Sequence, residues 1–85
     1  MSEPAALTLL SRQDCHLCEV AQRELDRLRV SYRVVDIDQD DALVERYNDV
    51  IPVVLYGETE LARAPIDASA LKRAVQALAL DKVRR

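Results

Sequence analysis

The sequence predicts one small α/β domain, and three observations support this prediction. The chain has 85 residues, which is enough for one hydrophobic core but not for two. Short apolar runs alternate with segments of helical periodicity, a pattern that is typical of α/β domains. With one glycine and three prolines, the chain has few residues that interrupt regular structure. We therefore expect residues 1–85 to form a single domain whose core lies within about residues 5–80.

The first half of the chain predicts a strand, a helix and a second strand. Residues 5–10 form a short apolar run, as a buried strand does. We expect a helix over residues 15–29, capped by Asp14, because apolar side chains recur there at helical spacing: Leu17, Ala21, Leu25 and Leu28. Residues 32–38 are rich in β-branched side chains and predict the second strand.

A short helix and a hairpin are expected next. The acidic cluster at residues 38–41 offers a cap and favourable charge to a helix N-terminus, and Asn48 offers a left-handed end to that helix. Residues 51–56 and 59–63 predict two strands, joined by a tight turn at residues 57–58.

The last element is a helix that Asp67 is expected to cap. Its apolar positions fit the i, i+3, i+4, i+7 pattern: Leu71, Ala74, Val75 and Leu78. The element order is then strand, helix, strand, helix, strand, strand, helix. Because a helix separates the first two strands, they are expected to be parallel, whereas the last two form an antiparallel hairpin.

Composition and charge exclude several classes of protein. The net charge is -3 with both signs interspersed, which argues against a nucleic-acid surface. No run approaches the roughly 18 apolar residues of a membrane span, and the N-terminus lacks the basic segment of a signal peptide. We therefore expect a monomeric cytoplasmic protein that binds neither nucleic acid nor membrane. Thiols are kept reduced in that compartment.

The only two cysteines, Cys15 and Cys18, lie in the segment D-C-H-L-C-E. Such a pair can hold a metal, form a disulfide staple or exchange electrons as a dithiol. Zinc usually takes four ligands and this pair supplies two, so no metal is expected. Haem attachment needs histidine directly after the second cysteine, and Glu19 stands there. The dithiol is the interpretation that we favour.

The expected position of the pair at a helix start has a chemical consequence. Backbone N–H groups and the helix dipole would face the sulfur of Cys15 and lower the pKa of its thiol. Cys18 would lie one turn further on, within reach for a disulfide. His16 would also favour a thiolate and Asp14 would oppose it, while Arg12 offsets Asp14.

These features resemble the glutaredoxin branch of the thioredoxin-fold superfamily, and particularly its small bacterial C-H-L-C members. The similarity spans about residues 6–80 and rests on the element order, on C-H-L-C at the first helix and on V-I-P at residues 50–52. The resemblance implies a four-stranded mixed sheet in the order 2-1-3-4, with helices on both faces.

The resemblance also implies roles for individual residues. Cys15 would be the nucleophile and Cys18 the resolving thiol, while Arg12 matches a position that is often basic in glutaredoxins. Pro52 would be the family's cis-proline facing the cysteines. The backbone of Ile51 would then be free to pair with an extended substrate segment.

The sequence departs from the family pattern at two places, and the second concerns glutathione. His16 and Leu17 stand where glutaredoxins usually carry proline and an aromatic residue. The family's Gly-Gly-Asp motif after the fourth strand is replaced by A-R-A-P-I-D, in which Asp67 is the one acidic residue. Asp67 is thus a candidate glutathione contact, although a plain helix cap is the interpretation we favour.

The sequence therefore predicts a thiol–disulfide oxidoreductase that reduces protein disulfides or glutathione mixed disulfides. No bound cofactor is expected, and glutathione is a candidate reductant. The alternative is a non-catalytic protein-binding module on the same fold, because function cannot be inferred from a fold alone.

Overall fold

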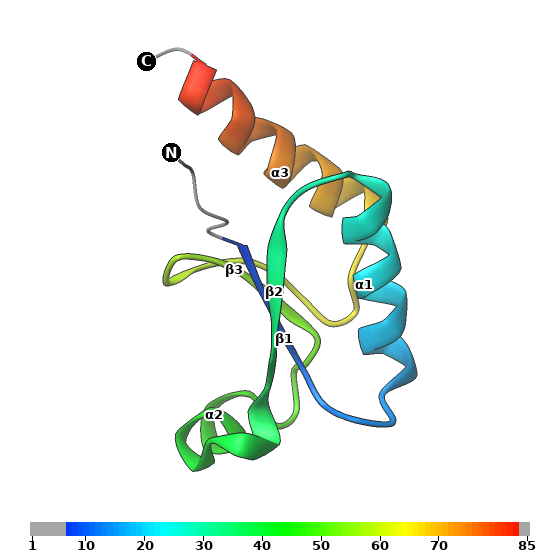
Figure 1. Ribbon diagram of the computed structural model, residues 1–85, viewed down its shortest axis with the longest axis vertical. Helices are drawn as coiled ribbons and strands as arrows, with labels where there is room; N and C mark the ends of the chain where they lie inside the picture. Colours follow the sequence, from blue (N-terminus) through cyan, green and yellow to red (C-terminus); the bar gives the residue numbers. More distant parts are fainter. Residues whose placement is uncertain (1–6, 84–85) are drawn as a thin grey trace.

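The computed structural model describes residues 7–83 and confirms the predicted order of elements (Figure 1). Besides the predicted elements, residues 7–83 contain one 3-10 turn, Ile37–Gln39. The strands and helices are β1 (Leu7–Ser11), α1 (His16–Arg27), β2 (Tyr32–Asp36), α2 (Asp41–Tyr47), β3 (Val53–Tyr56), β4 (Thr59–Arg63) and α3 (Ala68–Val83). Residues 5 and 6 of the first predicted strand lie outside the described residues.

The four strands form one mixed sheet in the order β2-β1-β3-β4, as predicted. β1 and β2 are parallel across α1, and Leu9 lies opposite Val34. On its other side β1 pairs antiparallel with β3, where Leu9 lies opposite Val54. β3 and β4 form the predicted hairpin, with Gly57 at φ +60° in its turn. Glycine adopts this left-handed conformation without steric cost.

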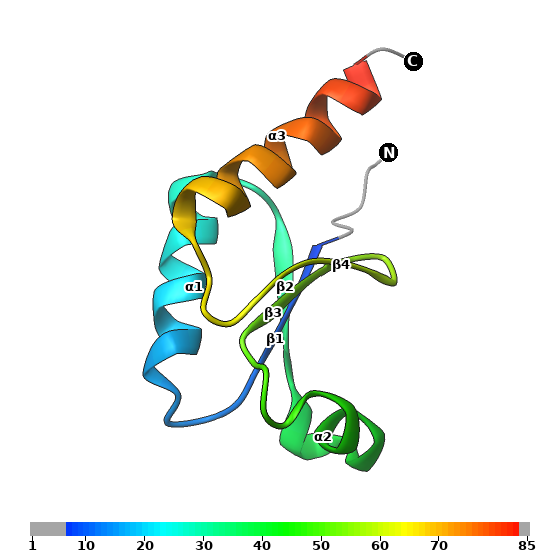
Figure 2. The same ribbon diagram turned by 180° about the vertical axis from the view of Figure 1, so that it is seen from behind.

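The two faces of the sheet carry separate apolar clusters, because successive strand residues point to opposite faces. Leu9 and Val54 lie in the larger cluster with Ala21 and Leu25 of α1 and with Leu71 of α3. Their chain neighbours Leu10 and Val53 belong to the second cluster, with Tyr47 of α2. Figure 2 shows α1 and α3 close together, with α2 at the far end of the sheet. The helices therefore lie on both faces, as predicted.

The first helix begins one residue later than predicted. Cys15, in extended conformation, is its N-cap, so the assignment of this role to Asp14 was wrong. Asp14 has φ +58°. This left-handed conformation is one that aspartate tolerates and that helices do not contain. The chain therefore turns at Asp14, and the helical conformation starts only after Cys15.

The predicted apolar stripe of α1 was also wrong at its first position. The buried residues of the helix are Cys18, Ala21 and Leu25, whereas Leu17 is 55% exposed. With 3.6 residues per turn, Cys18 falls on the same side of Ala21 as Leu25, whereas Leu17 falls on the other side, at the edge of the inward face. The loss of burial at Leu17 places a large apolar side chain on the surface between the two cysteines.

The predicted second strand is two residues too long. It ends at Asp36, whose carboxylate caps the 3-10 turn that follows. Asp40 caps α2, which confirms that the acidic cluster starts this helix. The left-handed end expected at Asn48 was wrong, since Asn48 has φ -49° and its N–H still donates to the Val44 carbonyl. The helical conformation thus continues through this residue.

Asp67 has the capping role expected of it. Its carboxylate accepts a hydrogen bond from the Ser69 N–H at 2.9 Å, at the start of α3. No helix in the part of the chain that the structure describes is long and apolar enough to cross a membrane.

Candidate redox site

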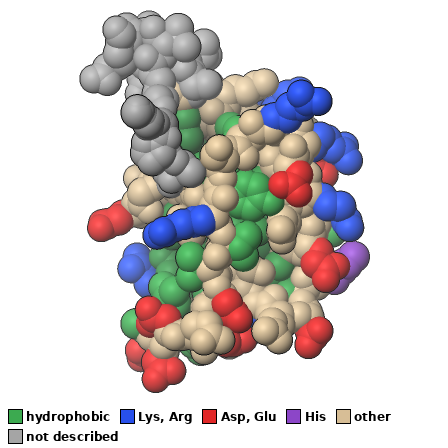
Figure 3. All heavy atoms as spheres, in the orientation of Figure 1, with side chains coloured by type: hydrophobic (Ala, Val, Ile, Leu, Met, Phe, Trp, Pro, Cys, Tyr) green, Lys and Arg blue, Asp and Glu red, His purple; other side chains and the backbone are tan. Residues whose placement is uncertain are grey.

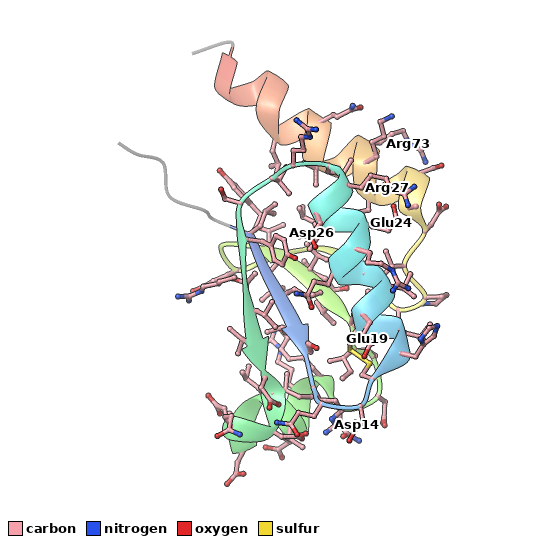
Figure 4. All side chains as sticks on the ribbon, turned by 45° about the vertical axis from the view of Figure 1, so that its right-hand side comes forward. Asp14, Glu19, Glu24, Asp26, Arg27 and Arg73 are labelled. Carbon is pink, nitrogen blue, oxygen red and sulfur yellow. A yellow bond between two sulfur atoms is a disulfide. The ribbon has the colours of Figure 1, made fainter. Side chains whose placement is uncertain are left out.

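The two cysteines lie at the N-terminal end of α1, after the loop that follows β1. They form a disulfide, and their Cα atoms are 5.2 Å apart. This separation is within the usual range for disulfides. Figure 4 shows the sulfur atoms at the lower end of α1, near the loop that contains Asp14. The sequence thus predicted correctly that Cys15 and Cys18 can join to each other.

The two sulfur atoms have different surroundings. Cys18 is 2% exposed and belongs to the inward face of α1, whereas Cys15 is only partly buried. An incoming reactant therefore meets Cys15 first. Cys18 is held behind it, within bonding distance.

Cys15 also accepts a hydrogen bond in its position as N-cap. The Cys18 backbone N–H donates to the Cys15 Sγ at 3.1 Å. That N–H has no partner within the helix, because the first N–H groups of any helix lack one. After reduction, this donor and the positive end of the helix dipole would stabilise negative charge on the Cys15 sulfur.

Pro52 lies at the same end of the sheet as the disulfide. The Ile51–Pro52 peptide bond is cis, as the family resemblance implied, and Pro52 is fully buried. The β1–β3 register pairs Leu10 with Val53. Pro52 therefore comes beside the end of β1, from which the chain continues to Cys15. A second cis bond, Ala64–Pro65, was not predicted.

Arg12 is held by a partner that the sequence interpretation missed. Its Nη2 and Nε atoms donate to the two carboxylate oxygens of Asp38 at 2.6 and 3.2 Å. The hydrogen bond from Arg12 lowers the pKa of the Asp38 carboxyl, and the same bond raises the pKa of Arg12. The signal for this pair was available, because β1 and β2 are parallel and residues that follow parallel strands meet at one edge.

The remaining predicted site residues lie at different places around the disulfide. His16 is exposed in the first turn of α1. Ile51 is half-buried, and no backbone hydrogen bond joins it to another residue between 7 and 83. Asp67 contributes its carboxylate to the cap of α3. In Figure 3, acidic side chains gather at the end of the visible face where α2 lies.

A groove between α1 and α3 lies away from this site. Its volume is about 460 Å³, and its lining includes Arg27 and Leu28 at the end of α1 and Ser69 and Lys72 of α3. The disulfide is at the opposite end of α1, a helix of 12 residues. That length corresponds to roughly 18 Å. Within residues 7–83 the structure shows no group of three or more histidine, cysteine or acidic side chains that could hold a metal.

Comparison with known families identifies the class of protein that this fold and disulfide define. The family described as Glutaredoxin-like domain (DUF836) matches residues 6–76. The chain therefore belongs to this glutaredoxin-like family of the thioredoxin-fold superfamily. A C-x-x-C disulfide in such a domain is consistent with thiol–disulfide redox chemistry.

Solved structures agree with the family assignment. A structural-genomics target protein from X. campestris is 37% identical, covers 85% of this chain and 97% of its own, and has a TM-score of 0.76. A protein from Nitrosomonas europaea is 29% identical over 86% of this chain and 93% of its own, with a TM-score of 0.69. Thioredoxin 1 from Thermosipho africanus, 15% identical, covers 93% of this chain and 98% of its own, and its TM-score of 0.60 shows the thioredoxin-like fold. Comparison with curated proteins gave no match.

Proposed function

We propose that this protein is a thiol–disulfide oxidoreductase that reduces protein disulfides or glutathione mixed disulfides. The observation that carries the proposal is the unequal pair of sulfurs at the start of α1. Cys15 is partly exposed, and its sulfur accepts a hydrogen bond from the Cys18 backbone N–H. Cys18 is 2% exposed and is joined to Cys15 by a disulfide. Such a pair can attack an external disulfide with one sulfur and resolve the product with the other.

The reaction has two exchange steps that balance in atoms and electrons. The Cys15 thiolate attacks one sulfur of the substrate disulfide, which forms a mixed disulfide and releases the other sulfur as a thiolate. Cys18, after loss of its proton to solvent, attacks Cys15 and releases the second substrate thiolate. Two electrons have then passed to the substrate, and the Cys15–Cys18 disulfide remains. Two molecules of glutathione, or a dithiol reductase, return those electrons.

Four other residues have supporting roles in this proposal. Ile51 is half-buried, and its backbone forms no hydrogen bond with another residue between 7 and 83. Its N–H and C=O groups can therefore pair with an extended substrate segment beside Pro52. Arg12 brings positive charge to the end of the molecule where the Cys15 thiolate forms, and the exposed His16 adds to it when protonated. A compartment that keeps thiols reduced, such as the cytoplasm, would supply the electrons for this cycle.

Single cysteine variants test the proposal directly. We expect Cys15→Ser to abolish the reduction of a model protein disulfide, because it removes the attacking sulfur. Cys18→Ser should instead accumulate a covalent mixed disulfide with the substrate, visible by non-reducing electrophoresis and mass spectrometry. The double variant controls for non-covalent association. Equal amounts of adduct in the two single variants would contradict the assigned roles, and an inactive wild type would contradict the function itself.

A further inference from the structure

A two-point ion pair joins Arg12, three residues before Cys15, to Asp38. Both donor positions of the guanidinium edge are used, with distances of 2.6 and 3.2 Å to the two oxygens of one carboxylate. This is the geometry with which arginine best recognises carboxylates and phosphates. The same edge is therefore occupied when a substrate arrives.

Arg12 is the cation that an anionic substrate would meet at this site. It is the only lysine or arginine among the first 22 residues of the chain, and it precedes Cys15 by three residues. Three residues span at most about 10 Å even when fully extended. This is slightly more than the roughly 8 Å screening length at physiological salt, so the charge of Arg12 is weakened but not abolished at the reacting sulfur. The nearest acidic side chains on the same segments, Asp14 and Glu19, would repel an anion (Figure 4).

Asp38 is held in place for this contact. Its own backbone N–H donates to the Asp36 carboxylate at 2.9 Å, in the 3-10 turn that follows β2. A competing carboxylate from solution has to displace an internal group that is already positioned. Internal competitors act at an effective concentration that reaches the millimolar range.

We propose that Asp38 is a specificity-determining residue that occupies the guanidinium of Arg12 and thereby selects against disulfides with a carboxylate near the sulfur. Glutathione mixed disulfides belong to the disfavoured class, since both ends of the tripeptide carry carboxylates close to its cysteine. Disulfides in proteins without a neighbouring acidic group belong to the favoured class. This inference rests on the proposed function, since it concerns the substrates of the same disulfide.

The test compares two substrates that differ in whether the two carboxylates of glutathione are charged. One is a peptide whose single cysteine carries glutathione, and the other is the same peptide carrying glutathione dimethyl ester. The measured quantity is the ratio of kcat/KM for the acid to kcat/KM for the ester. A change in the reactivity of Cys15 affects both substrates and cancels in this ratio, which therefore reports recognition alone.

Asp38→Asn is expected to raise this ratio about three- to fivefold, because it frees Arg12 for the substrate carboxylate. This is the upper part of the effect of exposed ion pairs. Asp41→Asn is the matched control, since it removes the same charge from the exposed first position of α2. The gain should be absent when Asp38→Asn is combined with Arg12→Gln.

Three results would overturn the inference. The ratio could be unchanged in Asp38→Asn. It could also rise equally in Asp41→Asn, which would show that the change in net charge causes the rise and not the release of Arg12. The gain could also persist without Arg12. In all three cases wild-type protein reduces both substrates, so the proposed function survives. If wild-type protein reduces neither substrate, the function and this inference fail together.

Discussion

Removal of the backbone N–H at position 18 should raise the pKa of the Cys15 thiol. Cys18→Pro removes this donor, and Cys18→Ser keeps it. Both variants lack the second thiol, so Cys15 titrates alone in each. Cys18→Pro leaves the backbone hydrogen bonds of the helix intact, because the Cys18 N–H donates to the Cys15 sulfur and not to a carbonyl. Proline is tolerated in the first turn of a helix for the same reason.

The expected size of the effect follows from the single bond that is lost. A hydrogen bond to a charged group contributes about 1.5–3 kcal/mol. Sulfur is a weak acceptor and Cys15 is only partly buried, so the lower end of this range applies. About 1.4 kcal/mol corresponds to one pH unit. The helix dipole acts in both variants and cancels from the comparison.

The assay is the rate of iodoacetamide labelling of Cys15 as a function of pH, followed by mass spectrometry. The midpoint of the profile should lie about one pH unit higher in Cys18→Pro than in Cys18→Ser. At neutral pH the rates should differ only about threefold, because a thiolate of lower pKa is also a weaker nucleophile. Superimposable profiles, in variants with equal helical circular dichroism, would refute the role given to this N–H.

Two further predictions concern stability. The pKa of Tyr32 is raised to about 12 by partial burial and by its 2.6 Å hydrogen bond to Asp26. Because the folded-state pKa is raised, the neutral tyrosine contributes stability below about pH 10, and this contribution is lost as the pH rises to 12. In urea unfolding, the free energy of unfolding of wild type should exceed that of Tyr32→Phe by about 0.5–1 kcal/mol at neutral pH, and this difference should disappear between pH 10 and 12. Asp67→Ala should lower the free energy of unfolding by about 1 kcal/mol through loss of the α3 cap, whereas Asp67→Asn should not. Reduced activity of Asp67→Asn at unchanged stability would show instead that the carboxylate binds substrate.

Local sequence patterns predicted most of the fold because each pattern was sufficient by itself. Residues 53–56 and 59–63 flank a glycine with positive φ, so the hairpin followed from local chemistry. The parallel pairing of β1 with β2 followed from the helix between them. The cis bond at Pro52 followed only from the family resemblance, since few X–Pro bonds are cis.

The errors arose where two local preferences competed. Asp14 and Cys15 are adjacent candidates for the cap, and the left-handed conformation of Asp14 decides between them. Leu17 and Cys18 are adjacent candidates for the inward face, and hydrophobicity favoured leucine. Cysteine, however, is among the residue types that are most often buried. The pair of Arg12 with Asp38 spans 26 positions, so no local pattern contains it.

The burial of Cys18 also bears on the alternative that this protein is a docking module without chemistry. A docking surface needs only exposed side chains, and Leu17, which is 55% exposed, would serve one. Docking needs neither the bond between the 2% exposed Cys18 sulfur and Cys15 nor an N–H directed at Cys15. A resolving thiol needs both features, because it must stay within bonding distance of Cys15 while the substrate reaches Cys15 alone. Leu17 can contact a client protein in either case, so it does not separate the two hypotheses. The Cys18→Ser adduct separates them, because a docking module forms none.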